Sequence, residues 1–384
     1  MSGNKLSRFI FNFASSAMLS LAPILLIIVY AHLGTYEQSA SLGLSLALAA
    51  PLFLMFSLQH GASILLGRVT PQEALEQRLG LAVLLLLSGA CLGFFYSNLT
   101  VVLFFLYRLG DYLYEVKFYR SVVRDESRSL LLEGVIRLGV QAFAVACAWK
   151  YIGSNENAVL IALASVNILF SISILKSSGF RARFGVLGVR KADIHLGVGA
   201  LVASVTINAP RYTAVAGDLV DYAAYSNLLS LVMGGTLLFA AVNNFLFSPY
   251  LSSSSFTVIS YLRWIGMLVL AGFSVCIFFV AFCEPVAVSL IEIIMGERYG
   301  AYYPYLYGLS FFYVLLFLQG ALNLLSIKLG LERSFLGATV ILLFTVLTLS
   351  YFSSNDLLML IFLVNLAYGL VLGSLLLGYR VCVK

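Results

Sequence analysis

The sequence predicts an all-α polytopic membrane protein with about twelve transmembrane helices in two six-helix lobes. First, 61% of the 384 residues are hydrophobic and only 10% are charged, whereas a soluble globular chain carries about 25% charged residues. Second, the apolar residues gather into runs that match the roughly 20 residues needed to cross a bilayer as a helix. Third, lysine and arginine crowd into every second connection, as the positive-inside rule describes.

The apolar runs define twelve expected spans joined by short connections. They cover residues 9–32, 40–65, 79–96, 99–120, 129–150, 157–175, 193–215, 222–248, 257–282, 301–326, 334–353 and 357–379. The segment 283–300 is expected to form a helical extension at the membrane surface. No connection is long enough to carry a separate catalytic domain, so we expect a protein that is not an enzyme.

The basic residues predict the orientation. Of the 23 lysines and arginines, 18 fall in connections on one side, three fall on the other, and Arg108 and Arg137 lie within spans. This bias places both termini in the cytoplasm. On this interpretation Arg78, Lys117, Arg120 and Arg124 are ordinary cytoplasmic positive charges. The excess of basic over acidic residues therefore reflects the membrane topology and does not indicate a nucleic-acid partner.

Sequence signals for cofactor chemistry are absent. The five cysteines stand singly in or beside apolar runs and form no Cys-x-x-Cys pair, so neither a metal site nor a disulfide framework is indicated. No Walker A sequence occurs, so the chain is not expected to hydrolyse ATP. We expect no cofactor, with H⁺ or Na⁺ as the candidate coupling ion.

The two halves of the chain resemble each other. Pro23 lies 13 residues before Tyr36, and Pro210 lies 12 residues before Tyr222. Each proline belongs to a span that leaves the cytoplasm and is followed by a short outer turn. We therefore expect a parallel repeat of six spans, with lobes at 1–180 and 181–384 joined by the polar connection 176–193. Paired repeats around a midplane site are typical of transporters.

One span carries charge deep into the apolar sequence. Arg108, Asp111 and Glu115 are spaced i, i+3 and i+7, which places them on one helical face. Glu133 and Arg137 enter on the following span, and Arg137 reaches about the same depth. Charge inside a membrane is costly and marks an internal ion pair or a polar pathway. Two interpretations remain open: a network that locks two helices, or an arginine that faces a cavity and binds an anion.

The second half offers fewer such groups. Arg211 lies toward the outer end of its span, and Asn208 lies one helical turn before it. Arg211 is interpreted either as an interfacial anchor or, together with Asn208, as part of a polar rim that contacts the substrate.

Three stretches resemble the Wzx-type polysaccharide flippases of the multidrug/oligosaccharidyl-lipid/polysaccharide exporter superfamily. They are FNFASSAMLSLAPILLIIVYAHLGTYEQSASLGLSLAL in the first two spans, NAPRYTAVAGDLVDYAAYSNLLSLV in the second half, and GERYGAYYPYLYGLSFFYVLLFLQGALNLLSIKLGLER near the tenth and eleventh spans. The resemblance extends over nearly the whole chain.

The resemblance implies a V-shaped alternating-access transporter in a bacterial inner membrane. Its cargo would be an undecaprenyl-diphosphate-linked oligosaccharide, such as an O-antigen repeat unit, moved from the inner to the outer leaflet. Membrane lipid is a further partner, and polysaccharide polymerase and chain-length machinery would act beside it. Arg108 and Arg137 are the candidates for contact with the diphosphate. Asp111, Glu115 and Glu133 would hold these arginines in the empty cavity and take up a coupling proton.

Three alternatives are kept. A drug or small-cation antiporter of the same superfamily would use the carboxylates to bind its cargo. A lipid II flippase would carry a different lipid-linked glycan. A polymerase or ligase of surface glycans would need catalytic groups on an outer connection, and the sequence contains none.

Overall fold

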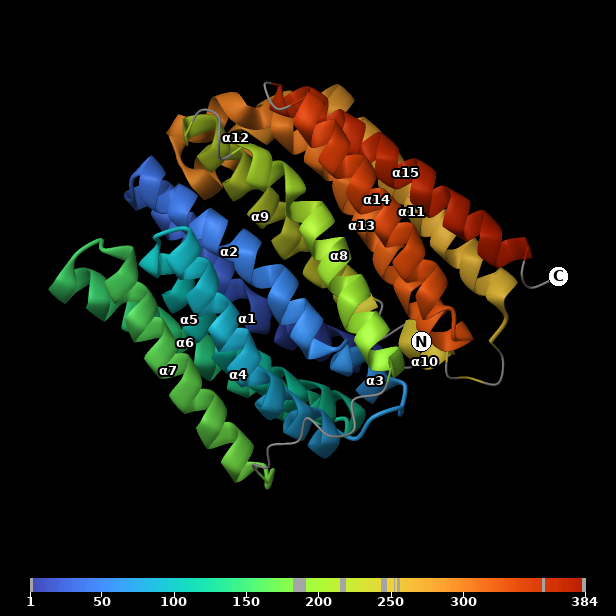
Figure 1. Cartoon of the computed structure of the whole chain (residues 1–384), viewed down its shortest axis with the longest axis horizontal. Coiled ribbons are helices and arrows are strands. Elements are labelled where there is room, and N and C mark those ends of the chain that lie inside the picture. Colours follow the sequence, from blue (N-terminus) through green and yellow to red (C-terminus); the bar gives the residue numbers. More distant parts are fainter. Residues whose placement is uncertain are drawn as a thin grey trace. The chain divides into compact units, whose positions relative to one another are not determined.

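The computed structural model describes residues 3–181, 191–214, 219–242, 247–251, 253, 256–353 and 356–381. Two compact units emerge from the residue contacts. Unit 1 contains the chain through Leu26 and Leu44–Leu201, and unit 2 contains Ile27–Gly43 and the chain from Val202 onward. The helices are drawn in sequence colours in Figure 1.

The first half of the chain forms seven helices in the described residues. They are α1 (Gly3–Leu33), α2 (Tyr36–Ser57), α3 (His60–Leu65), α4 (Pro71–Phe95), α5 (Leu99–Val123), α6 (Ser127–Ile152) and α7 (Glu156–Ser177). Within unit 1, α5 packs against both α4 and α7, and α6 packs against α7. The charged span predicted from the sequence is α5, and it packs between α4 and α7.

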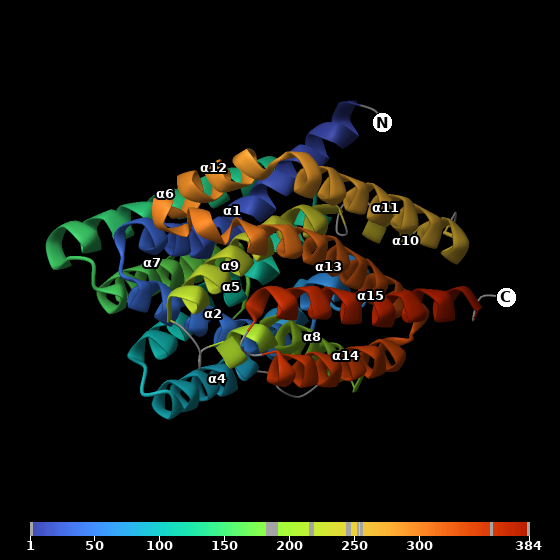
Figure 2. The same cartoon turned by 90° about the horizontal axis from the view of Figure 1, so that it is seen from above.

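The second half continues with helices throughout its described part. They are α8 (Lys191–Ala214), α9 (Leu219–Val242), α10 (Ser248–Leu251), α11 (Val258–Phe282), α12 (Glu284–Met295), the 3-10 helix η2 (Glu297–Tyr302), α13 (Tyr303–Leu329), α14 (Glu332–Phe352) and α15 (Leu357–Val381). In unit 2, α13 packs against α9, α11, α14 and α15, and Figure 2 shows α13, α14 and α15 running side by side.

The all-α prediction is confirmed, because the described residues contain helices and no strand. Twelve of the described helices have at least 21 residues, one for each expected span. Eight described helices are long and apolar enough to cross a membrane, or nine if the two halves of α1 count as one span. α5 is not among them because Arg108, Asp111 and Glu115 interrupt its apolar sequence. The chain is a multi-pass membrane protein.

Short polar sequences set several helix ends. Thr70 caps α4 in a capping box with Glu73, and Pro71 occupies the first turn, where a missing N–H costs nothing. Asn98 caps α5 by accepting from the Thr100 amide, and Asn155 does the same for the first turn of α7. These caps satisfy backbone donors that have no partner inside the helix.

The expected span 40–65 is broken in the structure. Leu58 and Gln59 adopt positive φ angles of 50° and 53°, and α3 begins at His60. Positive φ is uncommon for residues other than glycine. The Tyr112 hydroxyl of α5 donates to the carbonyl of Phe56 at 2.9 Å, beside the break. Packing against α5 thus stabilises a break that neither glycine nor proline signals.

The division into units differs from the lobe boundaries read from the sequence. The contacts place the boundary between Leu201 and Val202, inside α8, and assign Ile27–Gly43 to unit 2. The expected connection 176–193 lies partly outside the described residues, which stop at Arg181 and resume at Lys191. The lobes 1–180 and 181–384 stay a prediction.

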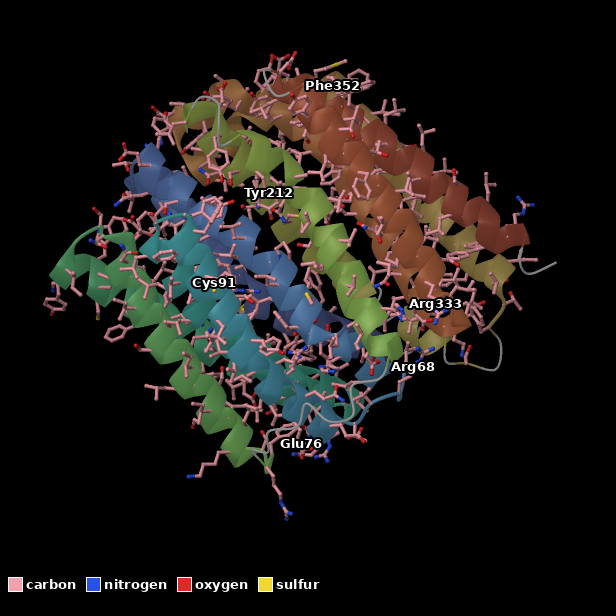
Figure 3. All side chains as sticks on the ribbon, viewed as in Figure 1. Arg68, Glu76, Cys91, Tyr212, Arg333 and Phe352 are labelled. Atoms are coloured by element: carbon pink, nitrogen blue, oxygen red, sulfur yellow. The ribbon has the colours of Figure 1, made fainter. Side chains whose placement is uncertain are left out.

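The surfaces of the helices are strongly apolar. Large apolar side chains are exposed along many helices, and on α11 they include Leu270 at 68% and Phe278 at 59%. Arg68 and Arg333, labelled in Figure 3, lie instead at helix ends, while Cys91 lies along α4. This arrangement is typical of helices that face lipid in their middle and water at their ends.

Candidate functional site

The polar centre of unit 1 forms where α5 and α7 approach closely. A Cβ atom added at Gly110 would lie 2.7 Å from the Asn167 Cγ, so only glycine permits this contact. Ser171, one turn after Asn167, donates to the Gly110 carbonyl at 2.8 Å. The close approach brings the Asn167 side chain between α5 and α6.

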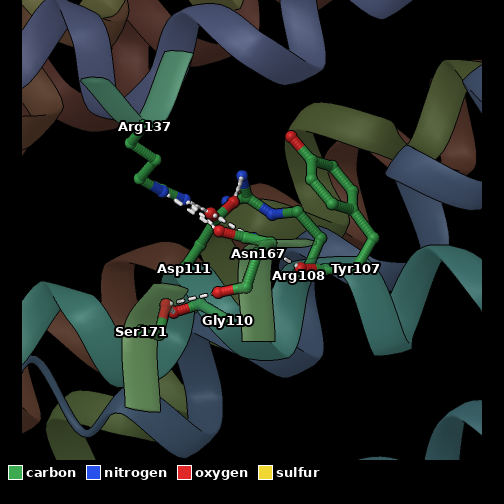
Figure 4. A network of polar contacts seen from close by, with 7 residues as sticks. All are labelled: Tyr107, Arg108, Gly110, Asp111, Arg137, Asn167 and Ser171. Carbon is green, nitrogen blue, oxygen red and sulfur yellow. Dashed lines mark hydrogen bonds and ion pairs between the residues drawn. The ribbon is translucent and has the colours of Figure 1, made fainter. Parts of the chain in front are cut away.

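Asp111 is the shared acceptor of this centre. Arg108 Nη1 lies 2.5 Å from Asp111 Oδ2, and Arg137 Nη2 forms an ion pair with Asp111 Oδ1. Asn167 donates to Asp111 Oδ1 and to the Tyr107 carbonyl, each at 2.8 Å, and accepts from Arg137 Nε and Nη2 at 3.0 and 2.9 Å. Figure 4 shows the two guanidinium groups converging on one carboxylate.

Burial separates the roles of the two arginines. The side chains of Arg137 and Asp111 are 3% and 8% exposed, whereas that of Arg108 is 28% exposed. Arg137 also lies over the Tyr114 ring, with its Cζ 5.1 Å from the centroid. Two positive charges meet a single negative charge here, and the excess charge is accessible through Arg108.

Two buried polar atoms on the same helices have no partner among the described residues. They are the Tyr107 hydroxyl on α5 and Gln141 Nε2 on α6, one turn beyond Arg137. Native proteins satisfy nearly all buried polar atoms, so an unpaired atom needs an explanation, and a bound water or ligand is one of them. Both atoms could bind a polar ligand that approaches the network.

A second ion pair joins α4 to α5. Arg78 is 1% exposed, and its Nη1 lies 2.8 Å from Glu115 Oε2. Arg78 also donates to the Tyr112 carbonyl and, through Nε, to His60 Nδ1 at 3.4 Å. The other nitrogen of the buried His60 lies 2.7 Å from Gln77 Oε1.

A third ion pair joins α5 to α6. Lys117 Nζ pairs with Glu133 Oε2, which also accepts from the Tyr114 hydroxyl at 3.2 Å. Lys117 is buried, with 5% of its surface exposed. Arg78 and Lys117 are therefore not free charges of a connection, because both are enclosed by neighbouring helices and neutralise carboxylates. The side of the membrane on which they lie stays a prediction.

Unit 2 contains a buried arginine of another kind. Arg211 is 1% exposed, and its guanidinium donates to Asn208 Oδ1 at 2.8 Å, to the Ser226 carbonyl at 2.6 Å and to Ser230 Oγ at 2.5 Å. Its Nε has no partner, and no carboxylate pairs with it among the described residues. Since Arg211 is enclosed by α8 and α9, it is not an exposed interfacial anchor.

The predicted residues are thus brought together only in part. Arg108, Asp111 and Arg137 meet as expected, and Asn208 contacts Arg211. Glu115 and Glu133 instead pair with Arg78 and Lys117, respectively.

Sequence reasoning missed Asn167 and Arg78. Asn167 could have been found, since a lone amide inside an apolar span is expected to face protein and not lipid.

Comparisons by sequence found no match: no family model fits the chain, and no curated protein matches it. Solved structures do match. A MATE protein in complex with MaL6 has a TM-score of 0.65 and 13% identity, covering 99% of this chain and 96% of that chain. A multidrug resistance MATE family transporter in an outward-facing conformation has a TM-score of 0.57 and 15% identity, with coverage of 100% and 98%.

A third match comes from Pyrococcus furiosus. This MOP superfamily transporter has a TM-score of 0.55 and 14% identity, covering 99% of this chain and 93% of that chain. The three likenesses extend over nearly the whole length of both partners. They show that this chain has the two-lobed, all-helical fold of these transporters.

Proposed function

We propose that this protein moves a lipid-linked oligosaccharide from one leaflet of the membrane to the other. The oligosaccharide would be carried on a polyprenyl diphosphate. The observation that carries the proposal is the charge balance of the polar centre. Two guanidinium groups share one carboxylate at Asp111, and Arg108 remains partly exposed. Arginine suits a phosphate because its planar fork donates two parallel hydrogen bonds and stays charged when desolvated.

The same balance disfavours a cationic cargo. A cation needs a carboxylate that is free to neutralise it. In α5 and α6, Asp111 is shared by Arg108 and Arg137, while Glu115 and Glu133 pair with Arg78 and Lys117. A cation would therefore have to displace a buried lysine or arginine, and an unpaired buried charge is strongly unfavourable.

Arg211 adds a second uncompensated positive charge in the other unit. Its three acceptors are neutral oxygens, and its Nε has no hydrogen-bond partner among the described residues. Dipoles of this kind solvate a buried cation without cancelling its charge. Arg211 thus supports an anionic cargo independently of the α5–α7 centre.

The arrangement suggests how binding could be coupled to movement. A diphosphate that reaches Arg108 competes with Asp111 for the guanidinium. Protonation of Asp111 would remove its charge, free both arginines for the phosphate and loosen the contact of α6 with α5. A ligand shifts the conformational equilibrium only if it binds the two states unequally, and this exchange of partners supplies such a difference.

The fold permits either polarity of cargo. The binding pocket of the Pyrococcus furiosus transporter has a reversed polarity, which suggests a different function for that transporter. A pocket of unusual charge on this fold thus has a precedent. The resemblance of the sequence to Wzx-type flippases then supports the choice of a lipid-linked glycan. The multidrug resistance MATE family protein and the Pyrococcus furiosus protein, which share this fold, are transporters.

The test is flipping in liposomes that contain the purified chain. A fluorescent undecaprenyl-diphosphate-linked sugar is placed in both leaflets, and a membrane-impermeant quencher reports how much reaches the outer one. We expect Arg108→Gln to lower the rate at least about tenfold and Arg108→Lys to retain part of it. Arg263→Gln is the matched control because Arg263 is exposed on α11.

Two outcomes would reject the proposal. One is an unchanged flipping rate in Arg108→Gln. The other is that the protein transports a lipophilic cation, such as tetraphenylphosphonium, into liposomes but does not flip the lipid-linked sugar. This outcome would favour the drug antiporter. Flipping of lipid II in preference to the shorter glycan would favour the lipid II flippase.

A further inference from the structure

A separate cavity opens at the predicted cytoplasmic end of unit 1. It has a volume of about 370 Å³ and lies between the start of α4, the end of α5 and the chain that follows α7. Its lining residues include Pro71, Gln72, Arg120, Val123, Arg124 and Phe180. Arg120 follows Asp111 by nine residues on α5, which places it about 14 Å further along the helix. The cavity is therefore distinct from the α5–α7 centre.

Arg120 is held in place by the end of α7. Its Nη1 donates to the Ser178 carbonyl at 2.7 Å, and its Cζ lies 4.6 Å from the Phe180 ring centroid. Gly179 has a φ of 75°, and the Phe180 amide donates back to the Leu175 carbonyl at 3.2 Å. This is the Schellman arrangement that often ends a helix. The guanidinium is thus oriented by protein alone, and its other donors remain available.

Gln72 fixes the opposite wall. Its Nε2 donates to the Arg181 carbonyl at 2.8 Å, and its Oε1 accepts from the Arg181 amide at 3.3 Å. This pair of hydrogen bonds attaches the chain after α7 to the first turn of α4. The cavity is consequently bounded by three elements that are connected without any ligand.

The cavity is positively charged on one side and apolar on the other. Arg124 is exposed, and neither it nor Arg120 forms an ion pair among the described residues. Val123, Pro71 and the Phe180 ring provide the apolar side. A ligand that fits both sides combines a phosphate with a hydrocarbon chain.

We propose that this cavity binds the phosphate group of a membrane lipid, with Arg120 and Arg124 on the phosphate and the first part of the chain against Val123 and Pro71. Basic pockets between transmembrane helices on the cytoplasmic side bind anionic lipid head groups. The lipid could be a phospholipid or a polyprenyl diphosphate, which share this chemistry. The proposal does not depend on which cargo reaches Arg108.

The experiment is native mass spectrometry of the purified full chain with single lipids. Phosphatidylglycerol is compared with diacylglycerol, and undecaprenyl diphosphate with undecaprenol. We expect the phosphate-bearing member of at least one pair to bind at least tenfold more tightly. The double variant Arg120→Gln/Arg124→Gln should abolish this preference for phosphatidylglycerol and, for undecaprenyl diphosphate, lower it to the binding that Arg108 retains. Whichever pair shows the effect identifies the source of the phosphate.

The matched control removes the same charge outside the cavity. Lys176→Gln/Arg128→Gln replaces two exposed basic residues of unit 1 that do not line it. This control should keep the preference for phosphatidylglycerol over diacylglycerol. Failure of the flippase proposal would appear only in the flipping rate of Arg108→Gln, so it is distinguishable from failure here. If Arg120→Gln does not fold, Arg124→Gln alone still tests the cavity, since Arg124 is exposed.

Three results would overturn the proposal. Equal losses in the cavity variant and the control would indicate general surface charge. Equal binding of phosphate-bearing and phosphate-free lipids would indicate an apolar groove only. Displacement of the lipid by millimolar inorganic phosphate, with no benefit from the hydrocarbon chain, would indicate a site for a free anion.

Discussion

Two deeply buried arginines, one in each unit, are accommodated in opposite ways. In unit 1, the side chain of Arg137 is 3% exposed, pairs with Asp111 and donates twice to Asn167 Oδ1. In unit 2, Arg211 is 1% exposed and donates to a serine carbonyl, a serine hydroxyl and an amide oxygen. One positive charge is neutralised by a carboxylate, and the other is only solvated by dipoles.

This difference distinguishes a charge that stabilises the fold from a charge that is available to a ligand. A buried ion pair is strongly destabilised when one partner is removed, because the remaining charge has lost its neutralisation. A cation held by neutral oxygens leaves no charge behind when it is replaced. We therefore expect Arg137 to determine stability and Arg211 to contribute mainly to the attraction of an anion. Four substitutions test this comparison.

The largest effect is expected for Asp111→Asn. It leaves Arg108 and Arg137 without a carboxylate, and removing one partner of a buried pair costs about 3–5 kcal/mol. Thermal unfolding of the purified protein in detergent would measure the loss. Glu37→Gln, which alters an exposed carboxylate, should leave the midpoint unchanged. A loss below about 1 kcal/mol in Asp111→Asn would show that the carboxylate does not lock the helices.

A smaller loss is expected for Arg137→Met. Asp111 keeps Arg108, but Asn167 Oδ1 loses the two hydrogen bonds that Arg137 Nε and Nη2 donate to it. A hydrogen bond to a charged group contributes about 1.5–3 kcal/mol, which sets the expected loss. The double variant with Asp111→Asn should lose less than the sum of the two single variants, since both remove the same ion pair. Strict additivity would contradict a shared network.

Gly110→Ala tests the helix contact that places Asn167. The new Cβ would lie 2.7 Å from Asn167 Cγ and 2.8 Å from its backbone carbon. Overpacking of this kind costs about 1–3 kcal/mol. Gly139→Ala on α6 is the control, because a Cβ there meets nothing within 4 Å. If both variants unfold at the same temperature, the α5–α7 approach does not position the network.

The smallest change in stability is expected for Arg211→Met. No carboxylate is left unpaired, and replacing buried charge by an apolar side chain of similar volume is often neutral or stabilising. Flipping of the lipid-linked sugar should nevertheless fall, as the attraction for the anion is lost. A large loss of stability would show that Arg211 is structural. An unchanged flipping rate would remove it from the proposed pathway.

The sequence by itself determined the helices and one of the ion pairs. Apolar runs are a local property, so their lengths predicted twelve long helices and their approximate ends. The spacing of Arg108 and Asp111 on one helix is likewise local, and their pairing followed from it. Antiparallel consecutive spans of comparable depth placed Arg137 level with Asp111 and Glu115, and the sequence did not decide between these two carboxylates.

Tertiary structure decided which partner each remaining charge would find. Glu115 faces Arg78 on α4 and Glu133 faces Lys117, because the rotation and lateral packing of each helix select among several basic residues at similar depth. The insertion of Asn167 depends on Gly110, which allows α7 to approach α5 closely. The break at Leu58 and Gln59 likewise depends on a neighbour, as Tyr112 of α5 hydrogen-bonds beside it. Hydropathy records how deeply a residue lies in the membrane, but contacts between helices also depend on the direction in which its side chain points.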